Sequence, residues 1–151
     1  MIVEARVTIQ GSRAAVWAAL TDVDKAAAIV RGIEAIEVVA RPASGLVGLR
    51  WRETRILFGE PATVEKRITE ATESAYTTQA EDGGFVFVTT HRLEASDGAI
   101  TVVATHETRP QGFVAAVKSL PMVLFKRTIQ KAILQDLSDI KSAVESGAPA
   151  R

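Results

Sequence analysis

Cysteine and asparagine are both absent from this sequence of 151 residues. Without cysteine the protein has no disulfide, no thiol nucleophile and no thiolate metal ligand. Without asparagine it has no acceptor for N-linked glycosylation, and glycine is left as the main residue for left-handed turns. These absences fit a cytoplasmic protein, and we expect that location.

An excess of charge and long apolar runs are also missing. Eighteen Lys and Arg residues balance eighteen Asp and Glu residues, so no overall field favours nucleic acid or an anionic membrane. No stretch approaches the roughly 18 apolar residues of a transmembrane helix. The opening MIVEARVTIQ alternates in polarity, and we expect no secretory signal there. We therefore expect a single domain with no transmembrane segment and no nucleic-acid partner.

The order of the elements follows from changes in the period of the apolar residues. Residues 3 to 9 alternate, which predicts a half-buried strand. Two short helices are predicted next, one over SRAAVWAAL with Ser12 as its cap and one over DVDKAAAIV. Between Ile33 and Arg109, turn residues separate six predicted strands. Each strand follows its neighbour as a hairpin, so the sheet is predicted to be antiparallel.

The last third of the sequence changes to a helical period. The apolar stripe consists of Phe125, Ile129, Ile133, Leu137, Ile140 and Val144, which predicts a helix over residues 122 to 145. Pro121 does not fit a helix interior, so the preceding QGFVAAVKSL is expected to be a separate piece. The domain is expected to span residues 1 to 146, followed by a disordered tail at 147 to 151. The predicted fold class is α+β, a seven-stranded antiparallel sheet curled around one long C-terminal helix.

A helix of this kind is too narrow to fill the concave side of the sheet, so we expect a pocket between the two. A two-residue turn at Gly59-Glu60 would place Glu53 opposite Lys66 and turn both toward the helix. The hairpin at Asp97-Gly98 turns both histidines to the same side. The residues predicted to line a ligand site are Trp51, Glu53, Arg55, Lys66, Tyr76, Phe87, His91, His106, Phe125 and Ile129.

The charged group on this predicted wall has two interpretations. Glu53, Arg55 and Lys66 either neutralise each other at the mouth of a cavity or anchor the polar end of a ligand. Acid or base catalysis by Glu53 is disfavoured, because neighbouring cations stabilise its charged form. If Glu53 pairs with Lys66, Arg55 remains as a free cation, and its removal is expected to maintain or raise the melting temperature.

The histidines and the tyrosine are predicted to line the wall, and the catalytic residues, if any, are unknown. His91 and His106 lack a third ligand at metal-binding spacing, so no metal is expected, and no cofactor either. Tyr76 is expected either to donate a hydrogen bond to a ligand carbonyl or to pack with its hydroxyl in water.

Four segments resemble the SRPBCC superfamily: VTIQGSRAAVWAALTDVDK, GLRWRETRILFGEPATVEKRITE, DGAITVVATHETRPQGFVAAV and KAILQDLSDIKSAVE. This superfamily groups START lipid-transfer domains, relatives of the birch-pollen allergen and bacterial polyketide cyclase/dehydrase-like proteins. The resemblance covers nearly the full chain in the same order. It implies a helix-grip fold with a deep hydrophobic cavity, and it carries over no catalytic motif.

Three functions are left open by the sequence. The first is the binding or carrying of a hydrophobic small molecule, lipid or polyketide-like, in the cavity. The second is a cyclase or dehydratase that uses the same cavity, and the third is an interaction module like the chaperone-ATPase activators of the superfamily. The sequence is compatible with a homodimer.

Overall fold

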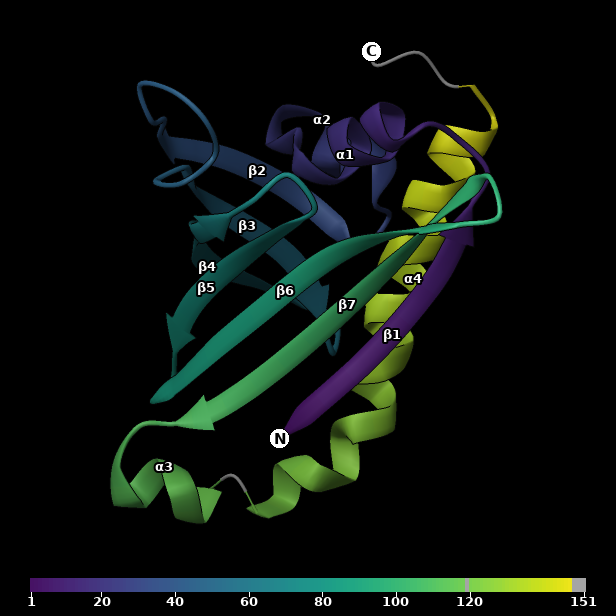
Figure 1. Ribbon diagram of the computed structural model, residues 1–151. Helices are drawn as coiled ribbons and strands as arrows, with labels where there is room; N and C mark the ends of the chain where they lie inside the picture. Colours follow the sequence, from purple (N-terminus) through teal and green to yellow (C-terminus); the bar gives the residue numbers. More distant parts are fainter. Residues whose placement is uncertain (119, 148–151) are drawn as a thin grey trace.

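A computed structural model describes residues 1–118 and 120–147 of the protein. A seven-stranded antiparallel sheet, in the order β1-β7-β6-β5-β4-β3-β2, curls around the long helix α4, Lys126–Glu145 (Figure 1). The strands are β1 (Ile2–Ile9), β2 (Ile33–Ala40), β3 (Arg50–Leu57), β4 (Glu60–Ala71), β5 (Ala75–Asp82), β6 (Phe85–Ser96) and β7 (Ala99–Pro110). The predicted α+β helix-grip fold is confirmed. Of the tail expected at 147 to 151, only Gly147 is among the described residues.

Two short helices, α1 (Arg13–Thr21) and α2 (Val23–Ile29), follow β1 as predicted. The hydroxyl of Ser12 accepts a hydrogen bond from the amide of Ala15 at 3.1 Å and so caps α1. The carboxylate of Asp22 caps α2 in the same way. Both helices lie at one end of the sheet beside the C-terminal half of α4 (Figure 1). They close that end of the space between the sheet and α4.

The long helix begins four residues later than the sequence pattern predicts. Residues Leu120–Phe125 form a 3₁₀ helix, η1, and α-helical geometry starts only at Lys126. The separate helix expected upstream is α3, Gly112–Lys118. A 3₁₀ helix has about three residues per turn, so it does not keep the 3.6-residue phase of the stripe. Phe125 is half exposed, contrary to its predicted place on the buried side.

The turn between β3 and β4 differs from the prediction by one position in each strand. Its central residues are Phe58 and Gly59, with φ of 52° and 82°, and Leu57 pairs with Glu60. Positive φ at both central residues is the geometry of a type I′ hairpin turn. Lys66 consequently pairs with Trp51 instead of Glu53. The alternation of side chains is unchanged, so the predicted inner face is correct although the predicted pairs are wrong.

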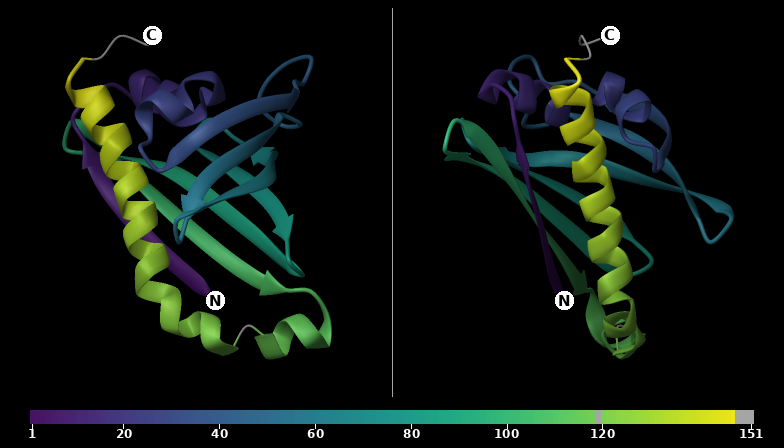
Figure 2. Two further views of the ribbon diagram at one scale, coloured as in Figure 1. Left: turned by 180° about the vertical axis from the view of Figure 1, so that it is seen from behind. Right: turned by 90° about the vertical axis from the view of Figure 1, so that its right-hand side faces the viewer.

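The helix α4 packs on one side of the concave face. Leu137 and Ile140 are buried against a cluster that includes Ile9, Val102 and Ala104. Figure 2 shows α4 crossing the concave side close to β1, while β3 and β4 lie farther from it. The cavity beneath the helix is lined in large part by residues of β3, β4 and β5. Among the described residues no helix is long and apolar enough to span a membrane.

Replacing Leu137 with Ala should lower the free energy of unfolding by about 2–5 kcal/mol, because the side chain is buried and leaves a cavity. Leu134 lies on the same helix but is exposed, so Leu134→Ala is the matched control and should change stability by less than about 1 kcal/mol. Chemical denaturation of both variants measures the difference. Equal losses would show that the buried side of α4 has been assigned wrongly.

Candidate functional site

A cavity of about 430 Å³ lies between the concave face of the sheet and α4. Its lining includes nine of the predicted residues: Trp51, Glu53, Arg55, Lys66, Tyr76, Phe87, His91, His106 and Ile129. Phe125 is not part of the lining, because it lies in η1 with its side chain exposed. Apolar side chains complete much of the wall, among them Leu20, Ile33, Val64, Ile68, Ile133 and Leu137.

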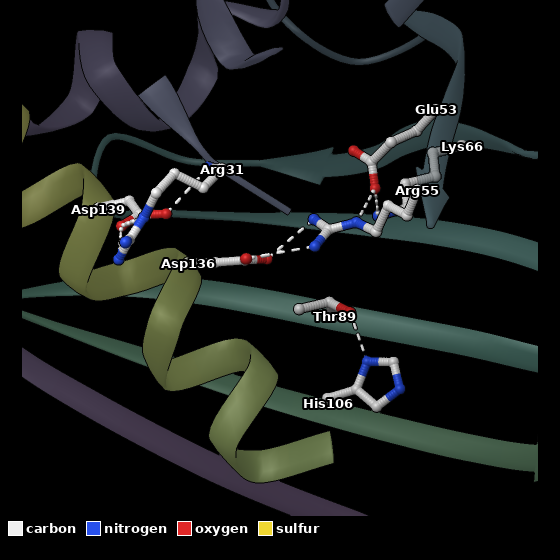
Figure 3. A network of polar contacts seen from close by, with 8 residues as sticks. All are labelled: Arg31, Glu53, Arg55, Lys66, Thr89, His106, Asp136 and Asp139. Carbon is white, nitrogen blue, oxygen red and sulfur yellow. Dashed lines mark hydrogen bonds and ion pairs between the residues drawn. The ribbon is translucent and has the colours of Figure 1, made fainter. Parts of the chain in front are cut away.

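A network of four charged side chains crosses the cavity from the sheet to α4 (Figure 3). Glu53 is only 6% exposed, and its Oε2 accepts hydrogen bonds from Lys66 Nζ at 2.6 Å and Arg55 Nε at 3.0 Å. The two terminal nitrogens of Arg55 then donate to both carboxylate oxygens of Asp136, at 3.2 and 2.8 Å. Arg55 is therefore a bridge between β3 and α4.

The expected free cation and positive excess are contradicted by this network. Arg55 engages both Glu53 and Asp136, and the network holds two cations and two carboxylates. Space for the Arg55 side chain depends on Gly32, where an added Cβ would lie 2.9 Å from Arg55 Nη1. The pairing prediction failed because it considered the sheet alone and left out the carboxylate that α4 supplies.

The environment shifts the pKa values of the two carboxylates of the network in opposite directions. Burial raises the pKa of Glu53, but the charges and hydrogen bonds of Lys66 and Arg55 outweigh it, and the net pKa is lowered. Asp136 has Arg55 as its main partner, so the effect of burial prevails and its pKa is raised. Burial opposes the charge of Arg55, yet its bonds to Asp136 and Glu53 raise its pKa overall. Glu53 is therefore a paired carboxylate at neutral pH, which disfavours it as a general acid.

A second bridge anchors α4 near the loop after α2. The backbone N–H of Arg31 donates to Asp139 at 3.0 Å, and its Nε donates to the same carboxylate at 3.1 Å. Asp139 is 8% exposed and also accepts a hydrogen bond from Gln135. Figure 3 shows that Asp136 and Asp139 leave α4 toward different partners. Two successive carboxylates of α4 thus fix the helix to the β2–β3 side of the fold.

The ring of Tyr76 stacks on His91, with ring centroids 5.0 Å apart and an angle of 15° between the planes. The Tyr76 hydroxyl donates to the backbone carbonyl of Leu20 at 3.2 Å, and burial raises its pKa, so it stays protonated. Within the described part of the chain, two buried side-chain nitrogens have no hydrogen-bond partner: Trp51 Nε1 and His91 Nδ1. The Tyr76 hydroxyl is therefore neither in water nor free to donate to a ligand carbonyl, contrary to both expectations, because the backbone of Leu20 takes its hydrogen bond.

Both histidines are neutral at physiological pH. Burial lowers the pKa of His91 to about 4, and the positive charge of Lys66 contributes. Burial and Lys66 lower the pKa of His106 to about 4 as well. His106 Nδ1 lies 2.8 Å from Thr89 Oγ1, which fixes the orientation of its ring. Within the described ranges, no three His, Cys, Asp or Glu side chains gather as a metal-binding group.

Comparison with known proteins identifies the family. Residues 1–145 match the family described as polyketide cyclase / dehydrase and lipid transport. The chain belongs to this family. A search of the curated proteins gave no match.

Three solved structures share the fold of this polyketide cyclase/dehydrase-like chain over nearly their full length. The protein TTHA0849 from Thermus thermophilus is 18% identical, with a TM-score of 0.80 over 98% of this chain and 99% of that one. The Zhui aromatase/cyclase from Streptomyces sp. R1128 is 21% identical, with a TM-score of 0.79 over 99% and 96%. A START superfamily protein from Mycobacterium smegmatis is 11% identical, with a TM-score of 0.79 over 97% and 99%. At these identities the likeness establishes the fold.

Asp136 is the main residue of the site that sequence reasoning missed. It follows Ile133 by three positions and precedes Ile140 by four, so it lies within the apolar stripe of this family member's last helix. A carboxylate on the buried side of a helix requires a cation as its partner. That spacing, combined with an inward arginine on the sheet, was the available signal for the Arg55–Asp136 bridge.

Arg55→Leu should lower the free energy of unfolding by about 1–3 kcal/mol, because it leaves Asp136 half-buried without its cation. This expectation replaces the unchanged or raised melting temperature that a free Arg55 implied. Arg52→Leu removes an exposed partner of Glu37 from the outer face of the same strand and should have an effect below about 1 kcal/mol. Thermal and chemical denaturation measure both. An Arg55→Leu protein as stable as the parent would contradict the bridge.

Stability should fall as the pH is lowered from 6.5, the ordinary histidine value, toward the folded value of about 4. The unfolded chain then binds protons that the folded histidines do not, which favours unfolding. Over the first pH units of this window the loss should be on the order of 2 kcal/mol for each histidine. A His91→Gln, His106→Gln double variant should show a flatter dependence above about pH 5, where few carboxylates titrate. An equally steep profile in the variant would assign the effect to other groups.

Proposed function

We propose that the protein binds and carries a hydrophobic small molecule, lipid or polyketide-like, in the cavity beneath α4. The observation that supports this most directly is the cavity itself: about 430 Å³, with largely apolar walls and one charged side formed by Glu53, Arg55, Lys66 and Asp136. A volume in the range of roughly 300–1,000 Å³ with these walls is typical of small-molecule sites. Membership of a family described by polyketide cyclase, dehydrase and lipid transport activities is consistent with this class of ligand.

Lys66 is the group that we propose to meet the polar end of the ligand. A lysine ammonium carries three donors, and within the described residues its one hydrogen bond is to Glu53. Arg55, by contrast, donates hydrogen bonds to both Glu53 and Asp136. A carboxylate, enolate or carbonyl oxygen near Lys66 would therefore find an available donor at the charged side of an otherwise apolar site.

Carrying is favoured over catalysis by the protonation states of the groups on the wall. A general base works best with a pKa near the working pH, whereas His91 and His106 have pKa values of about 4. Glu53 is ionised and bonded to two cations, and Tyr76 is a protonated donor already bonded to Leu20. These groups suit the orientation of a ligand better than proton transfer.

A fluorescent apolar probe, Nile red, should bind to the folded protein and be displaced by dodecanoic acid and by 1-dodecanol. Val64→Phe fills part of the cavity and should weaken the binding of both competitors. Thr63→Phe places the same side chain on the outer face of β4 and is the matched control. Lys66→Met should lower the affinity for dodecanoic acid roughly tenfold, about 1.4 kcal/mol. The affinity for 1-dodecanol should change much less.

Arg67, the residue after Lys66, points to the outer face of the sheet and provides the control for loss of charge. Arg67→Met removes one positive charge from the exposed face and should leave both competitors unaffected. Loss of probe binding in Thr63→Phe as well as Val64→Phe would place the probe outside the cavity. If Lys66→Met weakens the binding of the acid and of the alcohol equally, Lys66 does not recognise the polar end of the ligand. If no apolar ligand binds to the folded protein, the proposed function itself is contradicted.

A further inference from the structure

The connection between the sheet and the long helix carries an unusual share of exposed apolar surface. Half of the exposed large hydrophobic side chains in the described part of the chain lie in α3 and η1. They are Phe113, Val114, Val117, Val123, Leu124 and Phe125, and Phe113 and Leu124 are more than four-fifths exposed, at 83% and 84%. Scattered exposed hydrophobic residues are normal, but a group of this size in one segment marks an interaction surface.

The attachment of α3 to the domain leaves this apolar surface facing outward. Ala115 is the buried residue among the described side chains of α3, and it packs toward Gly84 in the turn between β5 and β6. The amide of Gln111 donates to the carbonyl of Gly84 at 2.7 Å. In Figures 1 and 2, α3 and η1 lie across the end of the molecule opposite α1 and α2, beyond the ends of β6 and β7. None of their described residues lines the cavity.

The same stretch of sequence is strongly basic in a chain whose net charge is zero. Between Thr108 and Gln135 it contains Arg109, Lys118, Lys126, Arg127 and Lys131 and no Asp or Glu. The acidic residues that bracket the stretch are already bound, Glu107 to Arg109 and Asp136 to Arg55. Lys126, Arg127 and Lys131 are exposed in the first turns of α4, and no described residue forms an ion pair with them. The overall balance of charge therefore conceals a local positive excess.

We propose that α3, η1 and the first two turns of α4 form a docking surface for anionic lipid membranes. Exposed aromatic and aliphatic side chains with uncompensated lysine and arginine beside them are the combination by which peripheral proteins bind the membrane interface. The apolar side chains enter the boundary between headgroups and acyl chains, and the basic ones contact lipid phosphates. A protruding end of the molecule suits a broad flat partner of this kind. The docking does not depend on whether the cavity holds a ligand.

Flotation of the full chain with phospholipid vesicles tests the proposal. The protein should float with phosphatidylcholine vesicles that contain about one third phosphatidylglycerol, and far less with phosphatidylcholine alone. Binding should weaken as salt is raised, because part of the attraction is screened. Phe113→Ser with Leu124→Ser should reduce the affinity roughly tenfold or more, and so should Lys126→Gln with Arg127→Gln and Lys131→Gln.

Matched variants elsewhere on the surface control for charge and hydrophobicity. Arg6→Gln with Arg52→Gln and Arg92→Gln removes the same number of charges from the strands and should leave flotation unchanged. Val123→Ser should also reduce flotation, whereas its control Val47→Ser, in the loop at the other end of the molecule, should not, although both valines are exposed. Circular dichroism confirms that each variant is folded, and the apolar and basic sets test the surface independently. The proposal is wrong if the folded full chain does not float with anionic vesicles, or if both sets of variants float as the parent does. It is also wrong if those variants abolish a homodimer without changing flotation.

Discussion

One helix, about 10–12 Å in diameter with its side chains, has to cover the concave face of a seven-stranded sheet. It packs on β1 and the first two helices, where Leu137 and Ile140 join the core. The other half of the sheet is left without a covering layer of side chains. The cavity, its mixed wall of apolar and charged groups, and the bridges that hold α4 all follow from this unequal coverage.

The Arg55–Asp136 bridge has a specific place in that arrangement. It links α4 to β3 across the uncovered half of the sheet, where apolar contact between helix and strand is sparse. Each half-buried charge requires its partner, so the bridge fixes the distance between α4 and β3. The space beside the bridge stays open. Glu53 and Lys66 continue the same chain of contacts along the wall. The groups that position the helix are thus the groups that give the cavity its polar side.

The sequence predicted the elements well because their signals are local. Alternation defined the strands, Ser12 defined the start of α1, and side-chain parity placed Trp51, Tyr76 and His91 on one face even where the pairing of β3 with β4 was wrong. The failures concern contacts between distant segments. No local signal joined Arg55 to a carboxylate 81 residues away, and the helical period did not reveal that Phe125 belongs to a 3₁₀ turn. The positive excess around α3 was missed for a different reason, because the overall composition averages it against acidic residues elsewhere.

Methyl-labelled NMR titration with a medium-chain fatty acid tests the central claim, that the space under α4 is a ligand site. Val64, Ile68, Ile129 and Ile133 face the cavity, whereas Val47 and Ile56 are exposed outside its lining. Our account predicts saturable shifts in the first group at a single affinity, with little change in the second. Shifts confined to the exposed methyl groups, or to Val117, Val123 and Leu124 alone, would show that the fatty acid binds on the surface and would contradict the account.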